Sequence, residues 1–382
     1  MSGIYIHIPF CKRKCVYCNF YSVCDTTLIP AYVSALKKEM ALRAAYLSGD
    51  ITQSLYIGGG TPSLLSIAEL QDIIQKASFI FSLNSTAEIS LEANPDSLSE
   101  DFIHKLKDSG INRLSIGIQS FYDDDLQTLN RLHKAEQAER CIDYAYKHGF
   151  TNISVDLMYG FPSLTLQKWK QNLEKLKDIP HLSCYQLSLE KGTAMLENIR
   201  KGKYILPSED EIMEQYAYLM SFTKSNQFIH YETSNFCKPG YESKHNCAYW
   251  ENKKYIGLGP GAHSYDLFHR QWNVTDLNTY ISFLNNISDP EQYLATAENI
   301  LFEKETLTPD MRYNEYVMTS LRTLKGCDIS YIQQHLGNDY VNYLYKQLKN
   351  VQTDYYMLTK KTLLLSEKGR LFADFVASSL FI

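Results

Sequence analysis

The first half of the chain carries six short apolar runs, each followed by a stretch with more mixed polarity. The runs lack the in-and-out alternation of strands that face water on one side, which indicates strands covered on both faces. Such strands alternating with amphipathic helices form βα units and a parallel sheet. The runs are GIYIHI, SLYIGGG, EISLEANP, NRLSIGIQSF, NISVDLMYGFP and HLSCYQLSL. Six units are too few for an eight-unit barrel, so we predict an α/β fold built on a partial (β/α)6 TIM-like barrel.

The length of 382 residues exceeds what one hydrophobic core usually supports, so we expect a main domain and a smaller one. We predict a barrel over residues 1–230 and a connecting segment, rich in aromatic residues and glycine, over 231–300. Helical patterns and a hairpin in residues 301–382 predict a small α+β winged-helix-like domain. This last segment carries ten basic against nine acidic residues. That charge balance favours a structural or partner-docking role over DNA binding.

The composition is that of an ordinary globular protein, with 45% hydrophobic and 21% charged residues. A net charge of −5 argues against a generic nucleic-acid binder. No apolar run approaches the length of a membrane span, and the first residues lack the pattern of a signal peptide. We therefore expect a cytoplasmic protein, in which disulfides are rare.

Three of the nine cysteines stand close together in HIPFCKRKCVYCNF. In a reducing compartment, the bunching of Cys11, Cys15 and Cys18 indicates metal binding or redox chemistry. One interpretation is a structural zinc ion, which needs four ligands and would take Cys24 or His7 as the fourth. The other is a cubane iron–sulfur cluster, in which three thiolates hold three irons and leave one iron open. We expect the three basic residues between the first two thiols to favour the thiolate form.

The spacing Cys-x3-Cys-x2-Cys resembles the signature of the radical S-adenosylmethionine (radical SAM) superfamily. The resemblance implies a [4Fe-4S] cluster on Cys11, Cys15 and Cys18, whose open iron is chelated by the amino and carboxylate groups of S-adenosylmethionine. In that superfamily the cluster's electron cleaves the sulfonium and yields a 5′-deoxyadenosyl radical. The absence of a fourth cysteine is then explained, because the cofactor takes its place.

Further polar residues stand near the ends of the predicted strands, where the chemistry of such barrels collects. Alone, the glycine run at 58–60 would be a turn with free backbone N–H groups, and Glu92 a solvated carboxylate. Asp156 stands inside an apolar run, where an unpaired charge is costly. Together these segments resemble the coproporphyrinogen dehydrogenase-like branch of the superfamily. Carried over by matching motif, the residues that would line the cofactor pocket are Tyr5, Tyr17, Gly59, Gly60, Thr61, Glu92, Gln119, Arg131 and Asp156.

Two features depart from the dehydrogenase and resemble the HemW-type haem chaperones. The dehydrogenase motif continues to a fourth cysteine where this chain has Phe20. Because Cys11 lies near the start of the sequence, we also expect no counterpart of the extension that precedes the dehydrogenase's cluster. The stretch HNCAYW at 245–250 matches the His-Asn-x-x-Tyr-Trp signature of the chaperones. The resemblance implies that His245 binds haem iron, with a structural aromatic cluster as the alternative and His263 as a second candidate ligand.

We therefore predict a protein that binds haem and passes it to an acceptor protein. A [4Fe-4S] cluster and exchangeable S-adenosylmethionine would regulate the transfer, and dimerisation is one way in which they could do so. Three alternatives stay open. The first is radical decarboxylation of coproporphyrinogen III propionates, and the second is radical opening or methylation of a tetrapyrrole or another substrate. The third is a zinc-bound scaffold. The sequence assigns no catalytic residue.

Overall fold

The computed structural model describes residues 2–287 and 289–382, and its main feature is a 12-stranded sheet. The strand order is β12-β11-β10-β9-β1-β2-β3-β4-β5-β6-β8-β7. Its six central strands come from the six apolar runs and pair in parallel, in chain order. They are β1 (Ser2–Ile8), β2 (Thr52–Gly59), β3 (Leu83–Ala93), β4 (Arg113–Gln119), β5 (Ile153–Tyr159) and β6 (His181–Gln186). The predicted α/β class with a parallel sheet is confirmed.

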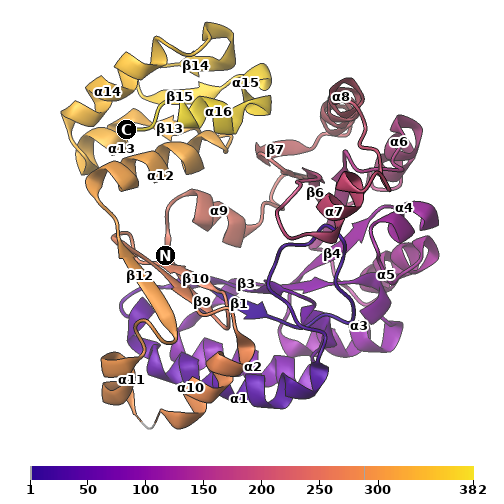
Figure 1. Ribbon diagram of the computed structural model, residues 1–382, viewed down its shortest axis with the longest axis vertical. Coiled ribbons are helices and arrows are strands. Elements are labelled where there is room, and N and C mark those ends of the chain that lie inside the picture. Colours follow the sequence, from indigo (N-terminus) through magenta and orange to yellow (C-terminus); the bar gives the residue numbers. More distant parts are fainter. Residues whose placement is uncertain (1, 288) are drawn as a thin grey trace.

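Helices follow the curved sheet along its outer side (Figure 1). They are α1 (Ile29–Leu42), α2 (Ile67–Ile80), α3 (Glu100–Leu106), α4 (Asp123–Thr128), α5 (Ala135–Lys147) and α6 (Leu166–Glu174). Helix α2 shows why these segments are helical: Ser66 and Glu69 form a reciprocal capping box at its start. Its buried residues recur with helical spacing and meet the core; they are Leu70, Ile73, Ile74 and Ala77. No helix of the described residues is long and apolar enough to cross a membrane.

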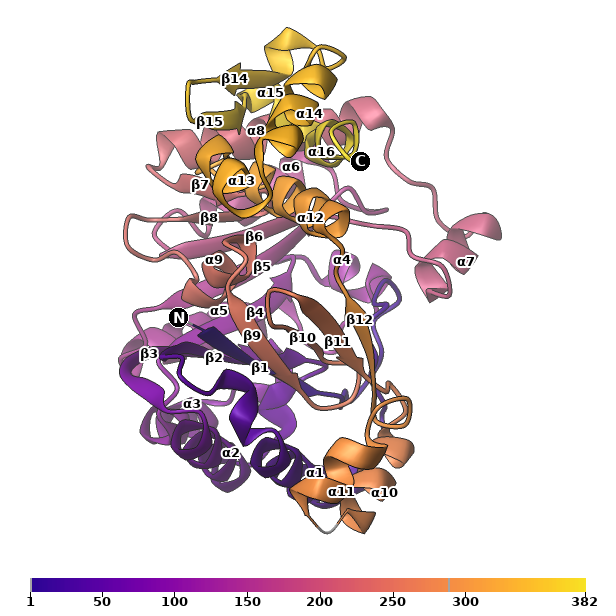
Figure 2. The ribbon, with the colours of Figure 1, turned by 90° about the vertical axis from the view of Figure 1, so that its left-hand side faces the viewer.

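Further strands extend the sheet beyond both edges of the six-stranded parallel part, next to β1 and next to β6 (Figure 2). On one side β9 (Lys254–Leu258) pairs in parallel with β1, followed by the antiparallel strands β10 (His263–Tyr265), β11 (His269–Asn273) and β12 (Phe302–Thr306). On the other side lie β8 (Asn235–Cys237) and β7 (Ile229–Glu232). The helices of this part are α7 (Ala194–Arg200), α8 (Glu209–Ser225), α9 (Lys244–Trp250), α10 (Leu277–Asn286) and α11 (Pro290–Thr296). Much of the expected connecting segment is therefore sheet.

The last part of the chain has its own three-stranded sheet, in the order β13-β15-β14, and its own hydrophobic core. Its elements are α12 (Pro309–Leu321), β13 (Cys327–Asp328), α13 (Ile329–His335), α14 (Asn338–Leu348), β14 (Tyr356–Leu358), β15 (Thr362–Leu365), α15 (Glu367–Leu371) and α16 (Ala373–Ser378). The hairpin of β14 and β15 lies where the sequence predicted one. The boundaries at 230 and 300, and the winged-helix-like class, stay predictions.

A buried ion pair joins α1 to the strands added beside β1. Glu39 and Arg43 stand one turn apart on α1, and their side chains are almost inaccessible to water. Besides Arg43 at 2.9 Å, the Glu39 carboxylate accepts hydrogen bonds from the backbone N–H of Gly259, the Asn273 amide and the Tyr280 hydroxyl. The charge is thus fully compensated by groups from three other segments, which ties the region after β9 to the barrel.

We predict that Glu39→Ala lowers the free energy of unfolding by about 3–5 kcal/mol, because it leaves the Arg43 guanidinium buried without its counter-charge. Urea unfolding of the cluster-free protein measures this. The matched control is Asp101→Ala, which breaks the exposed pair of Asp101 with Lys105 on α3 and should cost less than about 1 kcal/mol. Equal effects of the two substitutions would contradict a structural role for the buried pair.

Candidate functional site: two adjoining cavities

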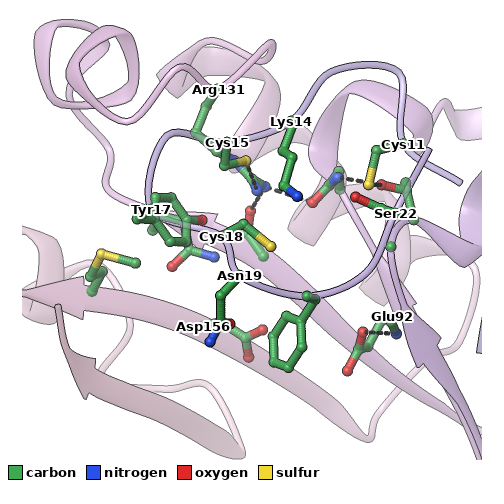
Figure 3. Close-up of a pocket in the computed structure, with 18 of the residues that line it drawn as sticks. Cys11, Lys14, Cys15, Tyr17, Cys18, Asn19, Ser22, Glu92, Arg131 and Asp156 are labelled. Carbon is green, nitrogen blue, oxygen red and sulfur yellow. Dashed lines mark hydrogen bonds between the residues drawn. The ribbon is translucent and has the colours of Figure 1, made fainter. Parts of the chain in front are cut away.

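The three clustered cysteines lie on the loop that follows β1, and this loop crosses over the sheet (Figure 3). They line a cavity of about 440 Å³. Eight of the residues singled out in the sequence line the same cavity: Tyr17, Gly59, Gly60, Thr61, Glu92, Gln119, Arg131 and Asp156. The fold therefore gathers residues from the loops and strands of five different βα units at one point. Tyr5 and His245 are outside this cavity and line a second one.

Two side chains of the first cavity donate hydrogen bonds to cysteine sulfur atoms. The Thr61 hydroxyl lies 3.6 Å from Cys11 Sγ, and Arg131 Nη1 lies 3.5 Å from Cys15 Sγ. Arg131 also donates to the Asn94 side chain at 2.6 Å, which fixes its guanidinium between β3 and β4. Donors of this kind stabilise negative charge on sulfur, as a thiolate or cluster ligand requires.

The expected effect of the basic run on the thiols is outweighed by burial at Cys11 and Cys18. Burial is the largest influence on the thiols of Cys11 and Cys18, and it raises the pKa of both. The charge of Lys14 lowers the pKa of Cys18, but this effect is smaller than burial. Lys12 points elsewhere and pairs with Asp96 at 3.0 Å. Thiols with raised pKa values become charged when a metal centre binds, because binding releases their protons.

The three thiols are not gathered around a single point. Across residues 2–287 and 289–382, no three His, Cys, Asp or Glu side chains are placed to hold one metal ion. Zinc needs four ligands around one centre, whereas a cubane takes one thiolate per iron, so its ligands stand apart. Both ring nitrogens of His7, one candidate for the fourth zinc ligand, are engaged by the Tyr5 hydroxyl at 3.1 Å and the Tyr21 carbonyl at 3.0 Å.

The glycine run at the end of β2 packs against the start of the cysteine loop. The N–H groups of Gly59 and Gly60 are not free, so that expectation is wrong for these two residues. Gly59 N–H donates to Glu92 at 2.9 Å, Gly60 N–H to the carbonyl that ends β1, and Thr61 N–H to the Phe10 carbonyl at 2.7 Å. A Cβ on Gly60 would lie 2.6 Å from the Phe10 carbonyl oxygen, and Gly59 has a φ of +108°. The run is thus needed to dock the loop.

Two carboxyl groups, Glu92 and Asp156, face the first cavity (Figure 3). Asp156 is not at a strand end but in the middle of β5, where it accepts a hydrogen bond from the Ser115 hydroxyl at 3.1 Å. Burial, and then the negative charge of Glu92, raise the pKa of Asp156 to about 7. Burial also raises the pKa of Glu92. Both carboxyl groups would ionise more readily beside a cationic ligand, so the first cavity suits a ligand of positive charge.

Aromatic residues and three histidines, His7, His245 and His263, surround the second cavity, of about 910 Å³. Its lining includes Tyr5, Tyr56, His245, Tyr249, Trp250, Tyr255 and His263. It shares four wall residues with the first cavity, namely Lys14, Asn19, Phe20 and Glu92. The two cavities therefore adjoin, and Phe20, at the place of the dehydrogenase's fourth cysteine, lies between them with 64% of its surface exposed.

His245 is held in a defined orientation on the short helix α9. Its Nδ1 lies 3.0 Å from the Ser54 hydroxyl, and its ring stacks on that of Tyr56 with centroids 5.1 Å apart. Burial lowers the pKa of His245 to about 4, so its imidazole is neutral at physiological pH. His263 is exposed and packs beside Trp272. Of the two candidate ligands His245 and His263, His245 has the preorganised ring.

Comparison with known proteins agrees with this architecture. A sequence model of the Radical SAM superfamily matches residues 5–176. The chain is 38% identical over 285 residues to the protein named Heme chaperone HemW of Lactococcus lactis, covering 73% of this chain and 74% of that protein. A Mycobacterium tuberculosis protein of the same name is 32% identical over 384 residues, covering 99% of this chain and 94% of that protein. The chain belongs to the HemW-type radical SAM proteins.

The fold of this HemW-type protein is also that of a solved radical SAM enzyme. The structure of coproporphyrinogen III oxidase (HemN) from Escherichia coli matches with a TM-score of 0.82, covering 100% of this chain and 90% of that one. The sequence identity is 23%, so this likeness bears on the fold alone.

Sequence reasoning missed Tyr56 and Ser54, which contact His245. The signal was present in the run SLYIGGG, because residues two apart on a strand face the same side. Once Gly58 is placed at a site, Tyr56 and Ser54 follow on the same face of β2. Because the run was interpreted as a strand with two apolar faces, this polar and aromatic face was not predicted.

We predict how Asp156→Asn changes the pH dependence of stability in the cluster-free protein. The unfolding free energy of the variant minus that of the unmodified protein, both from urea unfolding, should be larger at pH 8 than at pH 5. The pKa of Asp156 is raised to about 7 in the folded protein, whereas the unfolded chain has the ordinary, lower pKa of an aspartate. Between these two pKa values the folded protein holds a proton that the unfolded chain has lost, so stability falls as the pH rises. The amide removes this loss. A difference in unfolding free energy that is the same at both pH values would contradict the assignment.

Proposed function

We propose that this protein is a haem chaperone, which binds haem in the second cavity and passes it to an acceptor protein. In this proposal the first cavity holds a [4Fe-4S] cluster and exchangeable S-adenosylmethionine. The observation that carries the proposal is the aromatic-walled second cavity, in which a neutral, oriented His245 faces a space large enough for a macrocycle. The names of the relatives with similar sequence support it. We keep the prediction of a cytoplasmic protein as part of this proposal.

In the first cavity, the donor set suits the proposed cofactors. Cys11, Cys15 and Cys18 would each hold one iron, and Thr61 and Arg131 would donate hydrogen bonds to the coordinating sulfur atoms. When bound, the cluster supplies the electron that cleaves the sulfonium of S-adenosylmethionine in this superfamily. The two carboxyl groups described above would bind the cationic and hydroxyl-bearing parts of the cofactor, and Tyr17 offers a ring for the adenine.

In the second cavity, each group has a counterpart on haem. The Ser54 hydroxyl occupies Nδ1 of His245, which leaves Nε2 as the iron ligand. The rings of Tyr249 and Trp250, which stand nearly perpendicular to each other, supply apolar surface for the porphyrin. Lys14 lies on the wall and would pair with a haem propionate. The cavity volume lies at the upper end of the roughly 300–1,000 Å³ usual for ligand sites.

A radical enzyme acting on a tetrapyrrole, such as a coproporphyrinogen III dehydrogenase, is the second candidate. The observation that favours it is the shared wall, which would place a macrocycle in the second cavity beside the first. Such an enzyme forms 5′-deoxyadenosine in proportion to substrate turnover. The chaperone binds haem and releases it unchanged, so an assay for substrate-dependent 5′-deoxyadenosine separates the two functions.

We predict that changing any one of Cys11, Cys15 and Cys18 to Ser abolishes the cluster, because each would hold a separate iron. Iron and sulfide content after anaerobic reconstitution, with the visible absorbance of the cluster, measures this. The matched control is Cys24→Ser on the same stretch of chain, which is exposed and should retain the cluster. Loss of the cluster in the control would point to a fourth protein ligand, and retention in the other three would overturn the ligand assignment.

We predict that the reconstituted protein binds haem saturably and that His245→Ala weakens binding by about tenfold or more, with a shifted Soret band. His263→Ala is the control, because it removes a histidine from the same cavity without removing the oriented ring, and should change the affinity by less than about threefold. If the unmodified protein shows no specific haem binding, the chaperone proposal fails. If His263→Ala has the larger effect, the ligand is misassigned.

A further inference from the structure

Tyr56 touches the functional groups of both cavities. Its hydroxyl donates a hydrogen bond of 2.7 Å to Glu92 Oε1, and its ring stacks on His245 at an interplanar angle of 27°. Glu92 lines both cavities, whereas Tyr56 and His245 line the second. One side chain therefore connects an acid of the proposed cofactor cavity to the proposed haem ligand.

The two strands beneath Tyr56 hold His245 from another side as well. On β2, the Ser54 hydroxyl contacts His245 Nδ1, and on β3 the Glu88 carboxylate accepts a hydrogen bond of 3.3 Å from the His245 backbone N–H. Ser54 and Glu88 lie opposite each other in the parallel register of these strands. His245 is thus anchored by side chains of the same two strands that carry Tyr56 and Glu92.

The contact between Tyr56 and Glu92 depends on a glycine. A Cβ at Gly58 would lie 2.8 Å from the Tyr56 ring and 2.9 Å from the Glu92 carboxyl carbon. Real Cβ atoms do not come so close to other groups, so any side chain at this position would push Tyr56 and Glu92 apart. The first glycine of the run therefore makes room for this hydrogen bond, while the other two dock the cysteine loop.

Each oxygen of Glu92 already accepts one hydrogen bond from the protein. One of its oxygens accepts from the Tyr56 hydroxyl and the other from the Gly59 N–H. A cationic ligand in the first cavity would attract this carboxylate more strongly than a neutral hydroxyl does. If the carboxylate turns toward the ligand, its bond to the Tyr56 hydroxyl weakens. That bond helps to hold the Tyr56 ring stacked on His245, so the imidazole would be less well oriented toward the second cavity.

We propose that Tyr56 couples the two cavities, so that S-adenosylmethionine in the first weakens the binding of haem in the second. This inference rests on the proposed function and adds to it a direction, since cofactor binding favours haem release. Tyr56 is a positioning residue in this scheme, because it acts through Glu92 and His245. Linkage requires the reverse effect as well: haem must weaken the binding of S-adenosylmethionine by the same factor.

The test is a set of anaerobic haem titrations of the cluster-reconstituted full chain, with and without saturating S-adenosylmethionine. We expect the cofactor to weaken haem binding by about five- to tenfold in the unmodified protein. In Tyr56→Phe, which keeps the ring and removes the hydroxyl, the ratio of the two affinities should fall to within about twofold of one. The control is Tyr218→Phe, which removes a hydroxyl bonded to Glu174 away from both cavities and should retain the ratio of the unmodified protein.

Each outcome is informative. If haem binds His245 as proposed but its affinity is the same with and without S-adenosylmethionine, the coupling is refuted while the chaperone proposal stands. If Tyr56→Phe keeps the full ratio, or Tyr218→Phe loses it equally, Tyr56 is not the link. If haem does not bind specifically, both proposals fail. Equilibrium dialysis of S-adenosylmethionine on the unmodified protein, with and without haem, measures the same factor without any substitution, and a factor of one would refute the coupling.

Discussion

The placement of β1 between β2 and β9 is the constraint on which both cavities depend. The end of β1 pairs in parallel with the end of β2, so that His7 and Ile8 lie level with Gly58 and Gly59. The cysteine loop leaves β1 at this point and the glycine run leaves β2. On its other side β1 pairs in parallel with β9, which follows the helix that carries His245. One central strand therefore brings the thiols and the glycine run together at the carboxyl ends of the strands. His245 lies farther back along the same strands, against Ser54 near the start of β2.

The part of the fold that the sequence predicted is the part whose signal is local. Strands buried on both faces have apolar runs that can be recognised without knowing the neighbouring strands. The start of helix α2 is marked in the sequence by the Ser66–Glu69 capping box. The first cavity was predictable for the same reason, because parallel strands bring their loops to one edge. Most residues carried over from the family motif do line it.

The features that escaped prediction depend on partners distant in sequence. Strand β11 has the sequence HRQWN, which shows no apolar pattern, and it is a strand because it pairs with β10 and β12. Helix α9 has seven residues, too few to show a period, and it is held by Ser243 at its start. The pKa values of Cys11 and Cys18 follow from burial that no neighbour in the sequence reveals. The polar links beneath His245 are likewise made by β2 and β3, far away along the chain.

The central claim is that this protein has two adjoining ligand sites, one on the cysteine loop and one at His245. Anomalous diffraction at the iron edge, from crystals of the reconstituted protein soaked with haem, tests it most directly. The account predicts two separate iron sites in each chain, a cluster bounded by Cys11, Cys15 and Cys18 and a single iron next to His245 Nε2. A haem iron located elsewhere, or a cluster with a fourth protein ligand, would contradict it.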